Sequence, residues 1–128
     1  MALTEDEITR FLAGRHHAVL GINRKHASPH LTPVWYLWNG RTFEISTTRP
    51  TQKVVSLQRD PRVSISITDP DQPYIYAEFR GVVERIEEDP TGAFYNTLSD
   101  HYKSPSRYRG DPRVILYIKI QHVVGQNL

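Results

Sequence analysis

Apolar positions along the chain recur mainly with a period of two, which is typical of β-strands. The stretch 62–68 shows this most clearly, because Val63, Ile65 and Ile67 alternate with polar residues. The stretch 30–38, HLTPVWYLW, is instead apolar on both faces, which favours a strand buried on both sides. The strands that this pattern predicts are 17–23, 30–38, 41–48, 62–68, 74–88 and 113–123.

Short helices are predicted before and between these strands. Thr4, followed three residues later by Glu7, is a capping-box pattern that indicates a helix start. Asp60 and Pro61 form a typical helix stop, because the residue before a proline avoids helical geometry. The predicted helices are 4–13, 51–59 and 89–102.

Turn signals and element order indicate the fold class. Asn39-Gly40 between two apolar runs predicts a β-hairpin, and Gly81 within a long strand predicts a bulge or bend. Strands and helices do not alternate regularly, so a doubly wound parallel sheet is a poor fit. We expect a mainly β protein, a mainly antiparallel barrel with peripheral helices. With no repeat and no linker, residues 1–128 are expected to form a single domain.

Composition narrows the class of protein. Hydrophobic residues are 38% and charged residues 23%, which suits a globular chain rather than a disordered one. The net charge of +2 fits a small anionic ligand, whereas nucleic-acid binding would call for a concentrated basic stripe. The absence of cysteine excludes disulfides, thiolate catalysis and cysteine-ligated zinc. The sequence has no apolar run of about 20 residues for a membrane span and no apolar signal core, so we expect a cytoplasmic protein.

The corner between the strand at 41–48 and the following helix carries the clearest candidate chemistry. A helix start leaves backbone N–H groups unpaired and places the positive end of the helix dipole there, which suits an anion. Alternatively, Thr48 or Thr51 merely caps the helix, while Arg49 and Lys53 are solvated. The local pattern leaves both interpretations open. The side chains that could hold a phosphate are Thr47, Thr48, Arg49, Thr51, Gln52 and Lys53.

A second basic segment, HYKSPSRYRGDPR at 101–113, interleaves cations with tyrosines. It could cover a flat anionic ligand by stacking and charge, or it could be a solvated loop before the last strand. We treat the RGD tripeptide at 109–111 as coincidental. The residues concerned are Tyr102, Lys103, Arg107, Tyr108, Arg109 and Arg113.

Histidines and aromatic residues give weaker signals. His16 and His17 are adjacent and would point to opposite faces of a strand, so no metal site is expected. Trp35 and its aromatic neighbours could simply be core residues. Pro33, however, lacks a backbone N–H and therefore indicates an interrupted or edge strand. Such an edge could hold the polar rim of a heteroaromatic ring.

Three stretches, in order, carry a resemblance to a known family. They are SPHLTPVWYLWNGRTFEISTT (28–48), TQKVVSLQRDPRVSISI (51–67) and EFRGVVERIEEDP (78–90). Together they resemble the pyridoxamine-phosphate-oxidase-like split β-barrels, which bind flavin or deazaflavin. The Thr-Gln-Lys motif followed by L-x-R-D-P-R-V is most similar to the small actinobacterial-type enzymes that use the deazaflavin coenzyme F-420.

The resemblance implies a six-stranded antiparallel split β-barrel that forms a homodimer with two cofactor sites at the interface. It implies hydride transfer between coenzyme F-420 and a small organic substrate, with no catalytic side chain that can be named. The residues matching the family's contacts to the ring are Pro33, Val34 and Trp35, those along the ribityl chain are Ser46, Thr47 and Thr48, and those at the phosphate are Thr51, Gln52 and Lys53. The residues expected to approach the ring from the partner subunit are Tyr74 and Tyr76, and Tyr108 and Arg109 are further candidates.

Two other functions of the same fold stay open on the sequence. An FMN-binding oxidoreductase is the first, because Arg49 could supply the extra phosphate ligand typical of the flavin branch. The second is a nonenzymatic protein that binds or carries a cofactor. A nucleic-acid-binding barrel is a distant further alternative, and no membrane association is expected.

Overall fold

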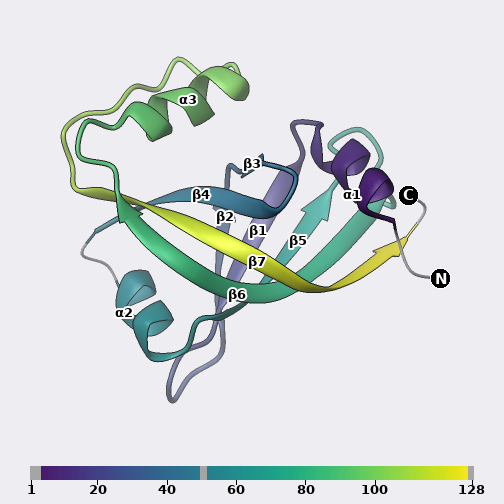
Figure 1. The fold of residues 1–128 in the computed structure, drawn as a ribbon, viewed down its shortest axis with the longest axis horizontal. Coiled ribbons are helices and arrows are strands. Elements are labelled where there is room, and N and C mark those ends of the chain that lie inside the picture. Colours follow the sequence, from purple (N-terminus) through teal and green to yellow (C-terminus); the bar gives the residue numbers. More distant parts are fainter. Residues whose placement is uncertain (1–3, 50–51, 127–128) are drawn as a thin grey trace.

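The computed structural model describes residues 4–49 and 52–126, and Figure 1 shows a strongly curved sheet with short helices around it. The strands are β1 (His17–Ile22), β2 (His30–Val34), β3 (Leu37–Trp38), β4 (Thr42–Thr48), β5 (Arg62–Thr68), β6 (Tyr76–Glu88) and β7 (Arg113–Gln126). The helices are α1 (Glu5–Leu12), α2 (Gln52–Arg59) and α3 (Ala93–His101).

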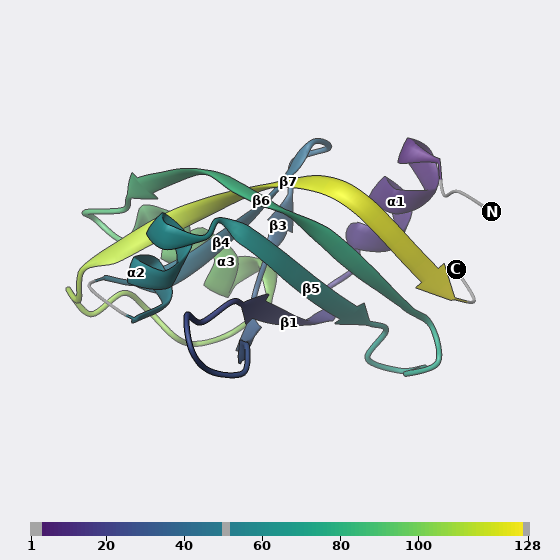
Figure 2. The same ribbon diagram turned by 90° about the horizontal axis from the view of Figure 1, so that it is seen from below.

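The sheet is antiparallel throughout and runs in the order β2-β1-β5-β6-β7-β4-β3. The two edge strands are therefore β2 and β3, which follow one another in the chain. The curl of the sheet brings these edges toward each other, as the two views in Figures 1 and 2 show. This architecture confirms the predicted mainly β, antiparallel split barrel.

The prediction of one strand over 30–38 was wrong, and the described residues form seven strands rather than six. The segment divides because β2 pairs with β1 at one edge while β3 pairs with β4 at the other. Burial on both faces was also wrong, since Leu31 is 68% exposed. Pro33 lies in the edge strand β2, and the strand is interrupted after Val34, so the expectation of an edge or interrupted strand is confirmed. An edge strand tolerates proline because the missing N–H costs it little.

The core lies inside the curve of the sheet and follows the period-two pattern. Val63, Ile65 and Ile67 of β5 are all buried. The alternating apolar residues of the neighbouring strand β1 lie beside them on the same face of the sheet. Phe43 of β4 contacts Phe79 of β6 edge-to-face, with ring centroids 5.1 Å apart. Each buried aliphatic or aromatic side chain contributes about 1.5–3 kcal/mol relative to exposure, so this alternation accounts for much of the folding free energy.

The Asn39-Gly40 hairpin is confirmed but is wider than a two-residue turn. Trp38 pairs with Phe43, so four residues form the loop. The Asn39 Oδ1 atom accepts hydrogen bonds from the backbone N–H groups of Arg41 (2.9 Å) and Thr42 (2.7 Å). Gly40 supplies the positive φ of 90° that the turn requires. The asparagine side chain therefore stabilises the turn, a role that a second residue in the left-handed conformation would have in a tighter turn.

The three helices lie outside the sheet. The predicted capping box of α1 is present, because the side chains of Thr4 and Glu7 bond to each other's backbone N–H groups. Helix α3 begins beyond Asp89, whose carboxylate accepts from the N–H groups of Phe94 and Tyr95. In both views α1 and α2 lie toward opposite ends of the sheet. None of the described helices has the length and apolar character needed to cross a bilayer.

Gly81 produces the predicted irregularity in β6, where the register with β7 shifts between Arg80 and Gly81. A Cβ atom at this position would lie 2.1 Å from the carbonyl oxygen of Lys119. The two backbones therefore approach more closely than any other residue type allows. This bulge adds to the bend of the longest strand pair and so to the curl of the sheet.

We predict that Gly81→Ala destabilises the protein by about 2 kcal/mol or more, because the new Cβ atom forces two strands apart. Gly21→Ala in β1 is the matched control, since its Cβ would meet only the flexible end of Leu31 at 3.2 Å. That variant should cost less than about 0.5 kcal/mol. Urea unfolding of both variants measures the difference, and equal midpoints would contradict a close backbone approach at Gly81.

Candidate functional site

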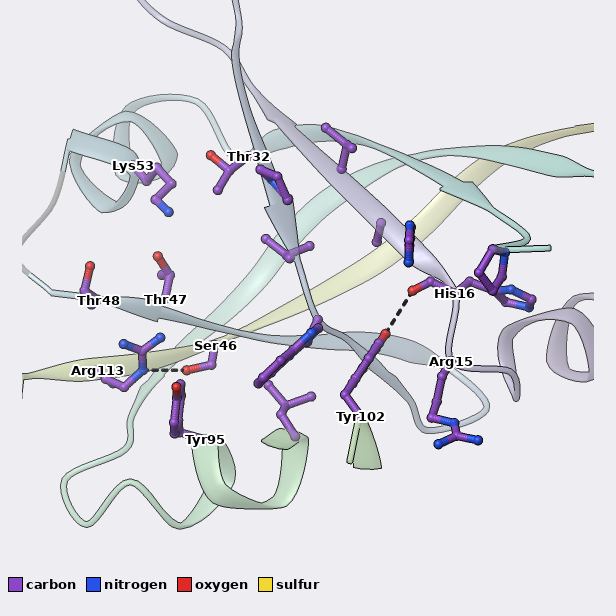
Figure 3. Close-up of a pocket in the computed structure, with 18 residues that line it drawn as sticks. Arg15, His16, Thr32, Ser46, Thr47, Thr48, Lys53, Tyr95, Tyr102 and Arg113 are labelled. Carbon is purple, nitrogen blue, oxygen red and sulfur yellow. Dashed lines mark hydrogen bonds between the residues drawn. The ribbon is translucent and has the colours of Figure 1, made fainter. Parts of the chain in front are cut away.

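A cavity of about 1070 Å³ lies outside the core, between the strands β1, β2 and β4 and the helices α2 and α3 (Figure 3). Its walls come from segments far apart in the sequence. The edge strand β2 and the residue after it supply one side, and α3 supplies another. Because β2 pairs only with β1, its other edge carries backbone groups that the ladder does not use.

One end of the cavity is formed by a lysine facing hydroxyl groups. The amine of Lys53 comes down from α2, and the hydroxyls of Thr47 and Thr48 point up toward it from β4 (Figure 3). In the part of the chain that the structure describes, no carboxylate lies within ion-pair distance of Lys53. Burial, and then the charge of Arg113, lower the pKa of the Lys53 amine below its ordinary value. A bound anion at this end would favour the charged form of Lys53 and so oppose both effects on its pKa.

Arg113, the first residue of β7, adds a second cation that is held in place. Its Nε atom donates to the Ser46 hydroxyl at 3.0 Å, and its Nη1 atom donates to the Asp111 carboxylate at 3.0 Å. The guanidinium also lies over the Tyr95 ring, 4.4 Å from the ring centroid. These contacts fix the guanidinium and leave further N–H donors for a ligand.

Two of the hydroxyls that line the cavity are buried and have no hydrogen-bond partner among the described residues. They belong to Thr47, which is 4% exposed, and Thr32 of β2. Both point toward the Lys53 end in Figure 3. Buried polar groups without partners cost about 1–3 kcal/mol each, so such groups mark places where a bound ligand can supply the missing acceptor.

A third unpartnered atom, Nδ1 of His16, has a different setting. The Nε2 atom of the same ring lies 2.6 Å from the carbonyl oxygen of Phe11 and, opposite a carbonyl, must be the donor. The His16 ring stacks on the Phe11 ring with centroids 4.4 Å apart. The His16 imidazole is therefore packed against α1. On the cavity side, it is the backbone carbonyl of His16 that accepts a hydrogen bond, from the Tyr102 hydroxyl.

Aromatic side chains form one wall of the cavity, the aromatic wall. Trp35 stacks on Tyr102 with ring centroids 5.2 Å apart and planes 14° from parallel, and it lies 6.5 Å from the Tyr95 ring. The Tyr102 hydroxyl donates to the His16 carbonyl at 3.2 Å and accepts from the Tyr36 N–H at 3.4 Å. Burial raises the pKa of the Tyr102 hydroxyl, which keeps it a neutral donor.

The lining of the cavity is positively charged. It includes Arg15, Lys53 and Arg113, and none of its described residues is an aspartate or glutamate. Low-dielectric walls that carry one sign of charge concentrate counter-ions. The cavity therefore favours a ligand with at least one anionic group and a flat apolar body that fits beside Trp35.

The structure brings together a majority of the residues predicted from the sequence, although their contact with a cofactor stays a prediction. Thr51 lies outside the described residues. Gln52 does not line the cavity, because its amide donates to the Ser56 hydroxyl at 3.3 Å. The predicted residues that line the cavity are Pro33, Val34, Trp35, Ser46, Thr47, Thr48 and Lys53.

The predicted residues outside this lining fall into two groups. Tyr74 and Tyr76 were expected from a partner subunit, which a single chain does not test. Tyr108 packs its ring where a Cβ of Gly92 would lie, and its N–H donates to the Asn96 side chain at 3.0 Å, so it anchors the loop to α3. Arg109 is exposed and does not line the cavity.

The two basic segments that the sequence left open are each divided by the structure. In the corner segment, Lys53 lines the cavity, but Arg49 instead pairs with Glu88 at 3.5 Å. In the 101–113 segment, Arg113 lines the cavity while Arg107 pairs with Asp100 on the surface. Neither segment is wholly solvated nor wholly part of the site.

Several lining residues were missed as site residues by reasoning from the sequence. Tyr95 and Leu98 of α3 were missed, because their spacing was a readable signal for a buried helix face but not for a cavity. Tyr102, the C-cap of α3, had been named only as part of the basic segment 101–113. Arg15 and Thr32 carried no local signal. No group of three or more histidines and carboxylates among the described residues is placed to hold a metal ion.

The curled antiparallel sheet with a cationic cavity at its edge places the protein in the class of split β-barrels. A family model described as pyridoxamine 5'-phosphate oxidase matches residues 4–127. The chain belongs to this family. The resemblance found in the sequence is thereby confirmed.

Solved structures support the same assignment. A protein described as an F420 reductase is 34% identical, with a TM-score of 0.85 over 91% of this chain and 94% of that one. A conserved hypothetical protein from Mycobacterium tuberculosis is 25% identical, with a TM-score of 0.76 over 98% and 86%. An FAD-binding protein from Mesorhizobium loti is 21% identical, with a TM-score of 0.66 over 96% and 94%, and shows likeness of fold alone.

We predict that Thr47→Val leaves the free energy of unfolding within about 0.5 kcal/mol of wild type or raises it, because the lost hydroxyl has no partner. Thr42→Val is the matched control on the same strand, since both threonines are 4% exposed. The Thr42 hydroxyl accepts from the Asn39 amide at 2.9 Å, so its loss should cost about 1 kcal/mol. Urea unfolding without ligand checks both, and a larger loss for Thr47→Val would contradict an unpartnered hydroxyl.

Proposed function

We propose that this protein is a deazaflavin-dependent oxidoreductase that transfers a hydride between coenzyme F-420 and a small organic substrate. The observation that carries the proposal is the Lys53 end of the cavity. There the Lys53 ammonium group, which has no ion pair among the described residues, faces the buried Thr47 hydroxyl, which has no hydrogen-bond partner among them. A phosphate group needs this combination of a cation and nearby donors.

The phosphate of the cofactor would be held by side chains from three elements. Lys53 from α2 and Arg113 from β7 would neutralise its charge, while Thr47 and Thr48 from β4 donate hydrogen bonds. A phosphate oxygen would give the Thr47 hydroxyl the acceptor that it lacks. The residues present therefore fit the phosphate of a flavin or deazaflavin.

The ring of the cofactor would lie against the edge strand. Pro33 and Val34 present the free edge of β2, and Trp35 supplies a flat apolar surface. When bound, the reduced cofactor supplies the hydride. The chain's own contribution is to orient the ring beside Trp35 and to exclude water with the inner face of α3, which includes Leu98.

The similarity to an F420 reductase favours F-420 over FMN as the cofactor. FMN is the second candidate, and one observation favours it. Lys53 and Arg113 together place two cations at the phosphate end, which suits the doubly charged monoester of FMN. The sequence analysis named Arg49 as a possible extra phosphate ligand for FMN. In the structure Arg49 pairs with Glu88 instead.

We also propose that the protein works as a homodimer, as the family resemblance implies, and in the cytoplasm, as the sequence analysis expects. Tyr74 and Tyr76 would then approach the ring from the partner subunit. Tyr74 is 78% exposed in the single chain, which leaves it accessible for such a contact.

Titration with F-420 and FMN side by side tests the proposed function. F-420 should bind with a change in its fluorescence, and Lys53→Ala should weaken its affinity about tenfold to 100-fold, the worth of one charge-assisted hydrogen bond. Lys25→Ala, which removes an exposed lysine away from the cavity, should bind as wild type does. Tight FMN binding with no response to F-420 would establish the second candidate instead.

The lowered pKa of Lys53 predicts a pH dependence of binding. The free protein loses the Lys53 proton at a pH below the ordinary value of 10.5, whereas a bound phosphate raises that pKa. Affinity for F-420 should therefore fall as the pH rises through the free-protein pKa of Lys53. Lys53→Arg keeps its charge over this range and should flatten the profile. Dissociation constants measured at increasing pH would refute this role of Lys53 if the two proteins gave the same profile.

A further inference from the structure

The cavity has a second cationic end, formed by the segment between α1 and β1. Arg15 lies in this segment and lines the cavity together with His17, the first residue of β1. In Figure 3, Arg15 lies beside Tyr102, on the side of the aromatic wall away from Lys53. The two cations therefore lie at separate positions on the lining of one cavity, on opposite sides of Tyr102 in Figure 3.

The guanidinium of Arg15 has no ion pair and no hydrogen bond within the part of the chain that the structure describes. Two carboxylates next to residues of this end in the chain are already engaged. Asp69, next to the lining residue Pro70, accepts from the N–H groups of its own turn at 2.8 and 3.0 Å. Asp100 at the end of α3 pairs with Arg107.

Arg15 lies close to the end of α3. It is an exposed residue, and in Figure 3 its side chain lies beside Tyr102, the residue that follows α3. Its charge acts on His101 at the end of α3, whose pKa is lowered first by burial and then by Arg15. Arg15 is therefore an exposed cation at the rim of the cavity, within electrostatic reach of α3.

Arg113 gives a useful contrast, because it lines the same cavity yet is tied to Ser46 and Asp111. Lys53 and Arg15 are the lining cations that lack such partners among the described residues. The volume of about 1070 Å³ lies at the upper end of the range of about 300–1,000 Å³ that is typical of small-molecule pockets. The cavity therefore offers two separate cationic positions for anionic groups.

We propose that the Arg15 end binds an anionic group of the electron acceptor, so that the substrates are small organic acids carrying a carboxylate. The inference rests on the proposed function in one respect, namely that the cofactor phosphate takes the Lys53 end. Arg15 would bind the carboxylate through two parallel N–H donors. The apolar body of the acid would then extend toward Trp35, where the cofactor ring lies.

This arrangement makes charge the basis of substrate choice. A neutral amide of the same shape would keep the contacts with Trp35 but would leave the Arg15 guanidinium without its anion. The Tyr102 hydroxyl already donates to the His16 carbonyl and accepts from the Tyr36 N–H. It therefore cannot compensate for the contact that Arg15 loses when the ligand is neutral. The structure therefore favours acids over their uncharged analogues at this end.

Matched pairs of acids and amides test the proposal without turnover. Benzoate and benzamide, trans-cinnamate and cinnamamide, and crotonate and crotonamide each differ in charge but hardly in shape. Ligand-observed NMR titration of the purified protein should show each acid binding about tenfold or more tightly than its amide, the order of one charge-assisted hydrogen bond. A wild-type protein with no preference for the acids would overturn the proposal.

Three variants locate the preference. Arg15→Gln should abolish it, whereas Arg10→Gln, which removes an exposed arginine of α1 outside the cavity lining, should keep it. Lys53→Gln should also keep it. A preference lost in Lys53→Gln and retained in Arg15→Gln would overturn the proposal, because the acids would then be occupying the phosphate end.

Titration of the same variants with F-420 separates this inference from the proposed function. Arg15→Gln should bind F-420 as wild type does, and a weakening of tenfold or more would assign Arg15 to the cofactor and overturn the proposal. If F-420 bound no variant while the acid preference at Arg15 persisted, the proposed function would fail and the anion site would stand.

Discussion

The short link between the two edge strands is the constraint on which the site depends. Strands β2 and β3 lie at opposite edges of the sheet yet are separated by two residues, Trp35 and Tyr36. Tyr36 turns into the core, where it is 1% exposed and its hydroxyl donates to the carbonyls of Leu12 and Gly14 at 3.2 and 3.3 Å. Trp35 must then turn the other way, toward α3. The core thus positions the aromatic wall of the cavity.

The Lys53 end of the cavity differs from the exposed surface in the setting of its polar groups. Exposed cations either pair with carboxylates, as Arg62 does with Asp60 and Arg80 with Glu78, both at 2.9 Å, or are solvated. Lys53 is half-buried and has no carboxylate partner among the described residues, and the buried Thr47 hydroxyl near it has no hydrogen-bond partner there either. A half-buried charge and a buried unpartnered hydroxyl oppose folding, so their presence together in one cavity is what a ligand-binding role explains.

Elements with strong local patterns could be predicted from the sequence. The alternation at 62–68 became β5, and the Gly81 bulge and the Asn39-Gly40 hairpin were both found. The division of 30–38 could not be predicted, because an apolar run has the same pattern whether a strand continues or two edges share it. In the site, Ser46 to Thr48 and Lys53 were found because a strand and the following helix keep them close in the chain.

The sequence by itself determined the period-two strands, the turns and the clustering of hydroxyls and Lys53 at one corner. These features depend on neighbours a few residues apart. Only the tertiary structure decided which distant residues complete the cavity. Tyr102 reaches Trp35, and Arg113 reaches Ser46, across 67 residues in each case. Those contacts depend on strand order and on the curl of the sheet, which arise from non-local pairing that no local pattern records.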